Sequence, residues 1–469
     1  MKILVAVAVT VVITYVFLLF VQVPVLAILF LGTIAFCAVF WVFPKSSVFF
    51  FLIFMLFQGP IAYFAKAGVV YNLEELGIVL MAVLVAVKKL VLRKPFYRSG
   101  VDLPLLSLVL IGTVSSFVYR IVPPVVAFGG LVLFLKGFLL FYIFLNLDLE
   151  EDDIRKFKTW FYMLGIFTVL YGVLAGIWPG IFLAAVGSVP YTRFGMPALQ
   201  AYLGHPGSFS ALMGVLFCFA FADRLSRKSP KSTLLVVIFL AGIILSLRRT
   251  TFLGVLCGSV CVLLSKQVRQ KLQKETSVKI LGIVLAVCVL FSGLIVVLYR
   301  DLAVSYLTSE SPRSMLFQAG VQGAADHFPL GSGFGTFSGG MGQKFYSPLF
   351  YKYRLSSTWG LSKANPGFIN DTFWPHIIAE TGVFGFLCYA GIIWALFRVC
   401  FRALRVFRSE TGMGLAIAAF MLLVLSLVES TKAPFYEMAL WTFFYFGSVG
   451  VLQSWMSKQR SSDEDPAGQ

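Results

Sequence analysis

Long apolar runs recur along almost the whole chain, and they restrict the folds open to it. A helix needs about 20 apolar residues to cross a bilayer. Runs of about that length, or somewhat shorter, lie at 3–21, 23–43, 47–64, 75–92, 103–121, 124–147, 159–178, 208–223, 232–247, 252–265, 278–299, 382–401, 412–428 and 435–455. Charged residues make up 13% of the chain, against about a quarter in soluble domains. We predict an all-α polytopic membrane protein with about 12–14 transmembrane helices.

Basic residues gather in short clusters beside the apolar runs, as topology determinants do. The clusters lie at 88–98, 224–231, 266–274 and 398–408. Counting spans from a cytoplasmic N-terminus puts each cluster inside, together with the C-terminus, and puts segment 300–371 outside. The formal charge of +17 is therefore explained by topology, which argues against a nucleic-acid partner. The run 3–21 lacks the small-residue cleavage site of a secretory signal.

The predicted spans divide the chain into five parts. Residues 1–158 are N-terminal transmembrane helices, and 159–299 are central helices with an outer loop at 179–207 and a turn at Arg248-Arg249. Residues 300–381 form a large outer loop with short helices. Residues 382–457 are the C-terminal helices, and 458–469 are a polar cytoplasmic tail. Because loops of this length are uncommon and usually functional, we predict that the large outer loop is catalytic.

The stretch between Lys231 and Lys266 would be roughly 50 Å long as one helix, although a bilayer core is only about 30 Å thick. Basic residues at both ends indicate that both ends lie inside. The stretch must therefore leave and return, turning at 246–251, which holds Arg248 and Arg249 at the outer surface. They could be snorkelling surface arginines, but we favour an anion site, because adjacent charges at membrane depth are expensive.

Several outer segments resemble the superfamily of O-antigen ligases and polysaccharide polymerases, which are bacterial membrane glycosyltransferases. Residues 248–254 (RRTTFLG) are similar to the family's Ser/Thr-Arg-Gly segment between two central helices. Residues 313–337, ending in DHFPLGSGFGTF, look like its "hPllGvGpgnF" segment, and residues 370–385 (NDTFWPHIIAETGVFG) look like its "HN-x-y-L…a-E-x-G-l-x-G" block. Residues 193–210 also resemble the family's "Gly…Asn-Pro" outer loop. The resemblance extends from about residue 160 to 455.

The resemblance implies an undecaprenyl-pyrophosphate-linked saccharide donor, an acceptor glycan, and reaction at the outer face of the bacterial cytoplasmic (inner) membrane. In the ligases a His occupies the position that falls on Asp371 here, and an Asp there looks more like the polymerase branch. We therefore predict a polysaccharide polymerase, with an O-antigen ligase or a protein O-oligosaccharyltransferase as the alternatives. Whether a chain-length regulator takes part stays open. A lipid-linked saccharide flippase is the alternative of another class, although transporters tend to hold their charges at the midplane.

Such a transfer needs cations for the pyrophosphate and a base for the attacking hydroxyl. Arginine binds phosphate oxygens bidentately and keeps its charge. We therefore predict Arg193 and Arg249 or Arg248 as pyrophosphate ligands, with Arg313 as a further candidate. Asp371 is the predicted base, since partial burial would raise its pKa; an N-cap for the helix that follows is the alternative role.

The remaining candidates are two histidines, one glutamate within an apolar helix, and two glycines. His376 is the alternative base, and His205 is a weaker one. Glu380 lies in an apolar helix and is expected to orient a neighbouring arginine. Gly333 and Gly335 are expected to allow a tight turn or a close approach of the backbone to a sugar. The histidines lack metal-ligand spacing, so we predict neither a metal nor a cofactor.

Overall fold

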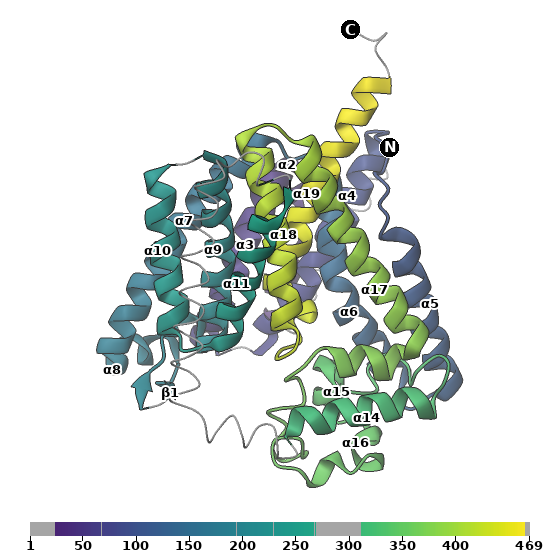
Figure 1. The fold of residues 1–469 in the computed structure, drawn as a ribbon. Coiled ribbons are helices and arrows are strands. Elements are labelled where there is room, and N and C mark those ends of the chain that lie inside the picture. Colours follow the sequence, from purple (N-terminus) through teal and green to yellow (C-terminus); the bar gives the residue numbers. More distant parts are fainter. Residues whose placement is uncertain are drawn as a thin grey trace.

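The computed structural model describes residues 24–66, 68–193, 195–227, 229–266, 268 and 311–464. In this part of the chain the long helices run through one bundle, with a smaller helical unit at one end (Figure 1). Eight of the described helices are long and apolar enough to cross a membrane. The predicted fold, a multi-pass helical membrane protein, is therefore confirmed. The predicted spans 3–21 and 278–299 lie outside the described residues.

Each of the other predicted spans corresponds to one helix. The bundle helices are α2 (Pro24–Val42), α3 (Pro44–Ala65), α4 (Leu73–Val91), α5 (Asp102–Tyr119), α6 (Pro124–Asn146), α7 (Glu151–Ile177), α9 (Pro206–Arg227), α10 (Pro230–Leu245), α11 (Arg249–Leu264), α17 (Trp374–Val406), α18 (Glu410–Glu429) and α19 (Ala439–Glu464). One difference is at α7, which begins well before residue 159. Glu150 and Asp153 form a capping box there and start the helix early.

The centre of the bundle is built from α6, α9, α18 and α19. Nearly every residue of α9 and α18 is buried, so these helices lie inside the bundle rather than against lipid. Where α19 meets α6, a Cβ added to Gly450 would lie 2.6 Å from the carbonyl oxygen of Phe141. Small residues allow helices to approach this closely, which is how helices associate when lipid supplies no hydrophobic driving force.

The stretch between Lys231 and Lys266 turns back, as predicted. Helix α10 ends at Leu245 and α11 begins at Arg249, with a backbone φ of +55° at Leu247 in between. The loop at 179–207 has the irregular backbone predicted for it. It contains α8 (Pro179–Phe182), a small hairpin of β1 (Thr192–Arg193) and β2 (Met196–Pro197), and the 3₁₀ turns η2 (Ala184–Val186) and η3 (Ala201–Leu203).

Residues 311–373 form a unit with its own hydrophobic core at one end of the bundle. Its helices are α14 (Pro312–Asp326), α15 (Gly339–Phe345) and α16 (Pro348–Lys352), with a 3₁₀ turn η4 (Leu355–Ser357). Leu316, Phe337, Leu349 and Phe350 are among the buried side chains of this core. Figure 1 shows the unit at the bottom, at the end of the molecule away from the labelled termini. We call this end the domain face and the other end the opposite face.

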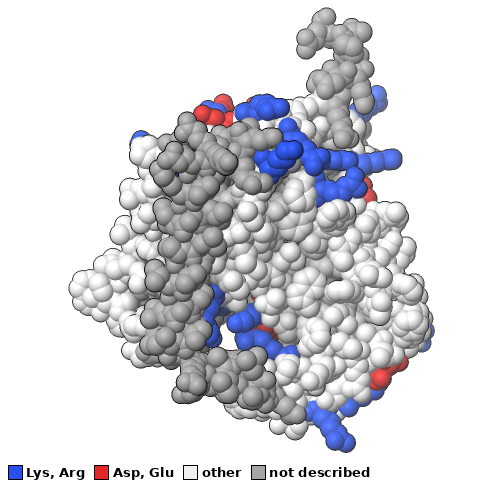
Figure 2. All heavy atoms as spheres, viewed as in Figure 1, with Lys and Arg blue, Asp and Glu red and all other residues white. Residues whose placement is uncertain are grey.

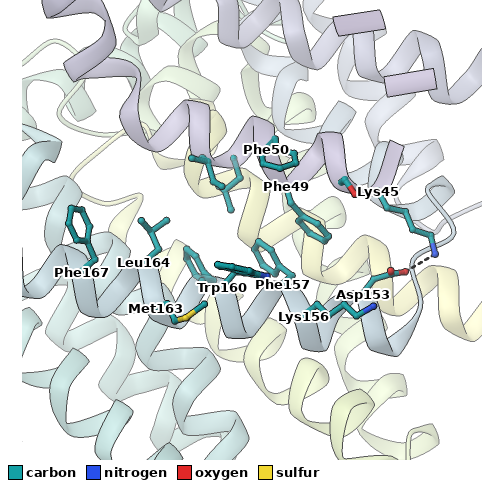
Figure 3. A pocket seen from close by; sticks show the side chains of 14 residues that line it. Lys45, Phe49, Phe50, Asp153, Lys156, Phe157, Trp160, Met163, Leu164 and Phe167 are labelled. Carbon is teal, nitrogen blue, oxygen red and sulfur yellow. Dashed lines mark hydrogen bonds and ion pairs between the residues drawn. The ribbon is translucent and has the colours of Figure 1, made fainter. Parts of the chain in front are cut away.

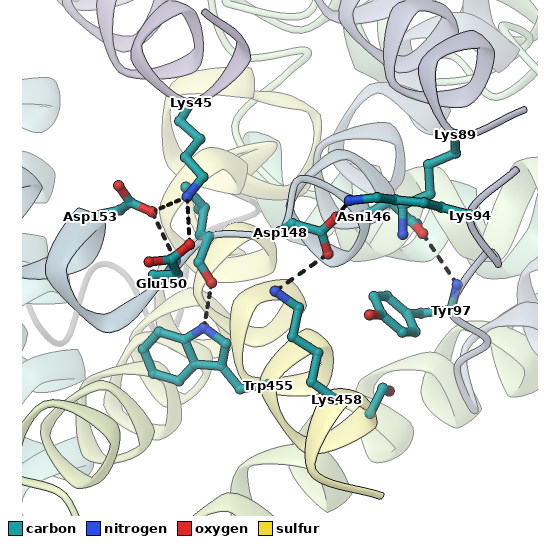
Figure 4. Close-up of polar contacts among 12 residues, drawn as sticks. Lys45, Lys89, Lys94, Tyr97, Asn146, Asp148, Glu150, Asp153, Trp455 and Lys458 are labelled. Carbon is teal, nitrogen blue, oxygen red and sulfur yellow. Dashed lines mark hydrogen bonds and ion pairs between the residues drawn. The ribbon is translucent and has the colours of Figure 1, made fainter. Parts of the chain in front are cut away.

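The opposite face carries a set of ion pairs in which every member has a partner (Figure 4). Lys45 of α3 lies 2.7 Å from Asp153 and 3.3 Å from Glu150. Asp148, in the α6–α7 connection, receives Lys94 at 3.5 Å and Lys458 of α19 at 3.4 Å. We call these six residues the opposite-face cluster. Its contacts connect α3 with the start of α7, and the α6–α7 connection with α19.

Candidate functional site

Arg248 lies at the turn between α10 and α11 and faces the end of α18. Its Nη2 lies 3.3 Å from Oε2 of Glu429, a carboxylate whose side chain is fully buried, and its Nε donates to the hydroxyl of Thr250 at 3.2 Å. Thr251 donates to the other oxygen of Glu429. The carboxylate therefore orients Arg248 and neutralises one positive charge. Arg249, the next residue, makes no ion pair or hydrogen bond through its side chain within the described residues.

The hairpin at 192–197 brings Arg193 to the same turn. Its Nη1 donates to the carbonyl oxygen of Leu247 at 3.2 Å, and its guanidinium lies 5.4 Å from the centre of the Tyr191 ring. His205 lies beside Arg248, since both side chains approach the same point at Gly207. A Cβ built on Gly207 would lie 2.1 Å from Nη1 of Arg248 and 2.7 Å from Nδ1 of His205. Arg193, Arg248 and His205 therefore converge, although the chain separates them by up to 55 residues.

His205 is neutral in this position. Its Nδ1 accepts a hydrogen bond from the backbone N–H of Gly207 at 2.9 Å, in the first turn of α9. Burial, followed by the charges of Arg248 and Arg193, lowers the pKa of His205 to about 4. Since Nδ1 accepts, the ring proton must be on Nε2, which leaves a neutral N–H donor beside the arginines.

Arg313 and Asp371 bring the outer unit to the same place. Nη2 of Arg313, in the first turn of α14, lies 2.6 Å from Oδ2 of Asp371. Burial raises the pKa of Asp371 above its ordinary value, while the charges of Arg313, Arg248 and Lys432 oppose that shift. The helix α17 that follows has no side-chain cap at its first residues. Asp371 is thus an ion-pair partner of Arg313 rather than the N-cap considered above.

Lys432, in the connection between α18 and α19, is a member of this site that sequence reasoning missed. The backbone N–H of Phe373 donates to the carbonyl oxygen of Ser430 at 3.1 Å, which places the end of the outer unit against this connection. Burial and the charges of Arg313, Arg249 and Arg248 lower the pKa of Lys432. The residue could have been found as a lysine in a short polar connection on the side predicted to face outward, where cations are disfavoured.

The site carries more positive than negative charge. Its cations are Arg193, Arg248, Arg249, Arg313 and Lys432, and its acids are Glu429 and Asp371, so five positive and two negative charges leave a net charge of about +3. We call these seven residues with His205 the domain-face cluster. Figure 2 shows Lys and Arg atoms around a hollow in the lower half of the molecule, toward the domain face.

Backbone and side-chain donors at this cluster are left for a ligand. The helices α9, α11 and α14 all begin here, at Pro206, Arg249 and Pro312. A helix N-terminus carries partial positive charge and free N–H groups, which favour anions. Nε of Arg313 is buried and has no hydrogen-bond partner among the described residues. Cations, helix ends and an unsatisfied donor together form a site for a multiply charged anion.

Gly333 and Gly335 lie elsewhere, pressed between the outer unit and the bundle. The residues around them are buried, and the backbone N–H groups of Ser332 and Gly333 donate to the carbonyls of Ala379 and Glu380 at 2.8 and 2.9 Å. A Cβ on Gly333 would collide with Ser116 of α5. Neither glycine has the exposed surface that the expected sugar contact needs, because both pack closely against the protein's own helices.

The same segment explains a break in α17. Gly382 has a φ of +64°, and Gly331, with a φ of +81°, packs directly against its backbone nitrogen. Only glycine takes such angles readily and leaves room for two backbones in contact. The break separates the first two turns of α17, which pack on α14, from the long span that follows.

Glu380 and His376 hold this joint together, and neither faces an arginine. The two oxygens of Glu380 accept from the backbone N–H groups of Gly335 and Phe337, each at 2.9 Å, so the neighbouring arginine expected for Glu380 is replaced by backbone donors. Nδ1 of His376 faces Glu380 and the carbonyl of Ser338, and its Nε2 lies 2.8 Å from Glu437. Both ring nitrogens thus face acceptors, which an imidazolium satisfies. A buried imidazolium is not available as the alternative base.

Comparison with known proteins finds one family for part of the chain. The sequence model of the O-antigen ligase family matches residues 234–390. This part of the chain, residues 234–390, is therefore similar to the O-antigen ligase-like superfamily. Among curated proteins, none matches it. The ligase-family match includes the α10–α11 turn, Arg313, Asp371 and Glu380, whereas Arg193, His205 and Lys432 of the domain-face cluster lie outside it.

Proposed function

We propose that this protein is a polysaccharide polymerase of the O-antigen ligase-like superfamily. In this proposal it transfers glycan from an undecaprenyl-pyrophosphate-linked donor to a sugar hydroxyl of an acceptor glycan. The reaction takes place at the outer face of the bacterial cytoplasmic membrane, with both termini in the cytoplasm. The observation that carries the proposal is the net positive charge of the domain-face cluster, at the end of a membrane bundle where a lipid-linked diphosphate would present its headgroup.

The cations would act on the leaving group. As the bond between the anomeric carbon and the phosphate oxygen breaks, the diphosphate leaves with the electron pair and gains negative charge. Arg249 and Lys432 lack side-chain ion pairs within the described residues, so both are free to receive that charge. Arg248 and Arg193 are held in place by Glu429 and by the Leu247 carbonyl. Positive charge that is already in position when the bond breaks usually contributes more to the rate than any other single effect.

Asp371 would act on the acceptor. Its Oδ2 is taken by Arg313, whereas its Oδ1 has no protein partner among the described residues and could accept the proton of the attacking hydroxyl. The new bond forms between that hydroxyl oxygen and the anomeric carbon, and the proton moves to Asp371. Arg313 keeps the carboxylate oriented, and burial keeps its basicity above that of a free Asp. The Nε2–H of His205 is placed to donate to a diphosphate oxygen.

The assignment to a polymerase rather than a ligase rests on Asp371, which stands where the related ligases carry a His. A ligase or protein O-oligosaccharyltransferase would use the same cations with another acceptor. A flippase would need only the anion site, without Asp371 as a base. The acceptor and the fate of the donor therefore separate these functions.

The test uses purified protein, a lipid-linked repeat unit from the host and EDTA, with products read as a glycan ladder. We expect wild type to form the ladder, and Arg249→Ala and Asp371→Ala to abolish it. One transfer step to lipid A–core or to protein would reassign the function to a ligase or oligosaccharyltransferase. Lipid-linked sugar that crosses proteoliposome membranes without any product would reject the enzyme and leave the flippase.

A further inference from the structure

A groove runs along the bundle between α3 and α7, and the proposed reaction does not use it. Its volume is about 740 Å³, which is within the range of about 300–1,000 Å³ typical of ligand sites. Figure 3 shows Phe49 and Phe50 of α3 facing Phe157 and Trp160 of α7 across it. At one end lie Lys45, Ser46, Asp153 and Lys156, which connect the groove to the opposite-face cluster.

The shape of the groove suits one lipid chain. Asp153, Lys156, Trp160, Leu164 and Phe167 follow one another at helical spacing, so they form a single stripe along α7. From Lys156, at the polar end, to Phe167 the helix rises by roughly 16 Å, about half of a bilayer core of about 30 Å. A chain anchored at the polar end would therefore lie within one leaflet.

The charges at the polar end distinguish this groove from an ordinary lipid-facing surface. Lys45 is paired with Asp153 at 2.7 Å. Lys156 is exposed and makes no ion pair within the described residues, while Trp160 lies one turn further along the same stripe and is 71% exposed. Lys45 is already neutralised by Asp153 and Glu150, so Lys156 is the lysine of the groove lining that is left to meet an anion. Trp at this depth is typical of the boundary between headgroups and chains.

We propose that this groove binds one anionic glycerophospholipid of the phosphatidylglycerol type. Its phosphodiester meets Lys156, and one acyl chain lies along the stripe from Phe157 to Phe167. The ammonium of Lys156, which has no ion pair within the described residues, matches a headgroup with one negative charge better than a zwitterionic one. The site is at the opposite face from the domain-face cluster, so it does not depend on the proposed function.

Lipid binding is tested with the full chain in nanodiscs that contain equal amounts of phosphatidylglycerol and phosphatidylethanolamine with the same chains. Native mass spectrometry then counts the lipids that stay bound to the released protein. We expect wild type to retain one phosphatidylglycerol, and Lys156→Glu to lower that occupancy roughly 10- to 30-fold, since it reverses a charge at the headgroup. Arg155→Glu is the matched control, because Arg155 neighbours Lys156 but pairs with Asp152 and does not line the groove. Equal effects of the two variants, or retention of phosphatidylethanolamine instead, would overturn the proposal.

A second measurement identifies the occupant directly. A photoreactive diazirine amino acid replaces Met163, which lines the groove and is 47% exposed. After irradiation in the same nanodiscs, we expect a phosphatidylglycerol adduct on the protein. An adduct to residues 1–23 of this chain, to another protein, or to no lipid at all would contradict the proposal.

Discussion

The two polar clusters at the ends of the bundle differ in how their charges are balanced. In the opposite-face cluster, three lysines meet three acids, and each has a partner at 2.7 to 3.5 Å. In the domain-face cluster, five cations face two acids, and Arg249 and Lys432 have no side-chain partner among the described residues. Unbalanced charge in a partly buried place is costly, so we expect a ligand to balance it. The balanced cluster needs no ligand and serves as a connection.

The largest effect expected at the domain face comes from removing the base. Asp371→Asn keeps the shape of the side chain, and its amide oxygen can still accept a hydrogen bond from Arg313, but the amide cannot take a proton. We expect the transfer rate to fall by roughly 10²- to 10⁴-fold. In wild type, activity should be lost as the pH falls through the raised pKa of Asp371, because only the carboxylate is a base. A wild-type rate in Asp371→Asn would mean that the residue only positions Arg313.

A methyl group added at Gly207 should displace side chains of the domain-face cluster without unfolding the protein. In Gly207→Ala the new Cβ would overlap Nη1 of Arg248 and Nδ1 of His205, two side-chain atoms that can move aside. We expect the displaced guanidinium to lower the transfer rate by up to roughly 100-fold, with a thermal midpoint near that of wild type. Gly195→Ala is the comparison in the same loop, since a Cβ there meets nothing within 4 Å, although its φ of +72° adds local strain. Equal activities of Gly207→Ala and wild type would show that the position of Arg248 does not matter.

A smaller effect is expected from Lys432→Gln, which removes one cation of five. Because Lys432 is half-buried, we expect roughly tenfold weaker donor binding, read as a higher KM. Burial and the three arginines lower the pKa of Lys432. Donor binding by wild type should therefore weaken as the pH rises through this pKa, because the ammonium becomes neutral. Lys432→Gln should lose this alkaline decline, and Lys432→Arg should shift it upward. An unchanged alkaline limb in Lys432→Gln would assign the decline to another group.

The smallest effect is expected on the balanced side. Lys45→Gln breaks the pairs with Asp153 and Glu150, but these side chains are between 23% and 74% exposed, so solvent screens their attraction. We expect a loss of about 0–1 kcal/mol in the free energy of unfolding and an unchanged transfer rate, measured by thermal unfolding and the ladder assay. A loss of transfer in Lys45→Gln would break the contrast between the two clusters.

Much of the fold could be predicted from the sequence, since the length of apolar runs and the placement of basic residues report membrane spans directly. The turn before Arg249 followed from basic residues at both ends of a stretch that is too long for one bilayer-spanning helix, which indicates that both ends lie on the same side. The convergence of Arg193, Arg248 and Arg313 could be suspected only because all three fall on one predicted side. Their contacts depend on how helices far apart in the chain pack, which no local pattern records.

The roles within the site were harder to predict, because residue type does not report exposure. His376 has the chemistry of a base, and Gly333 and Gly335 that of a tight turn or a sugar contact, yet packing against Glu437, α5 and α6 buries them. Lys432 could have been noted as a lysine on the outer side, but its membership of the site becomes apparent only when it lies beside three arginines. The acidic run at 148–153 supplies the acids of the opposite-face cluster.

The most direct test of the domain-face cluster is the binding of undecaprenyl pyrophosphate to purified protein in detergent with EDTA, with Kd measured for wild type, Arg249→Gln and Lys45→Gln. We expect Arg249→Gln to bind roughly 10- to 100-fold more weakly than wild type, Lys45→Gln to bind equally, and added salt to weaken binding by wild type more than by Arg249→Gln. Equal affinity of wild type and Arg249→Gln, or equal losses in the two variants, would contradict the assignment of the diphosphate to the domain face.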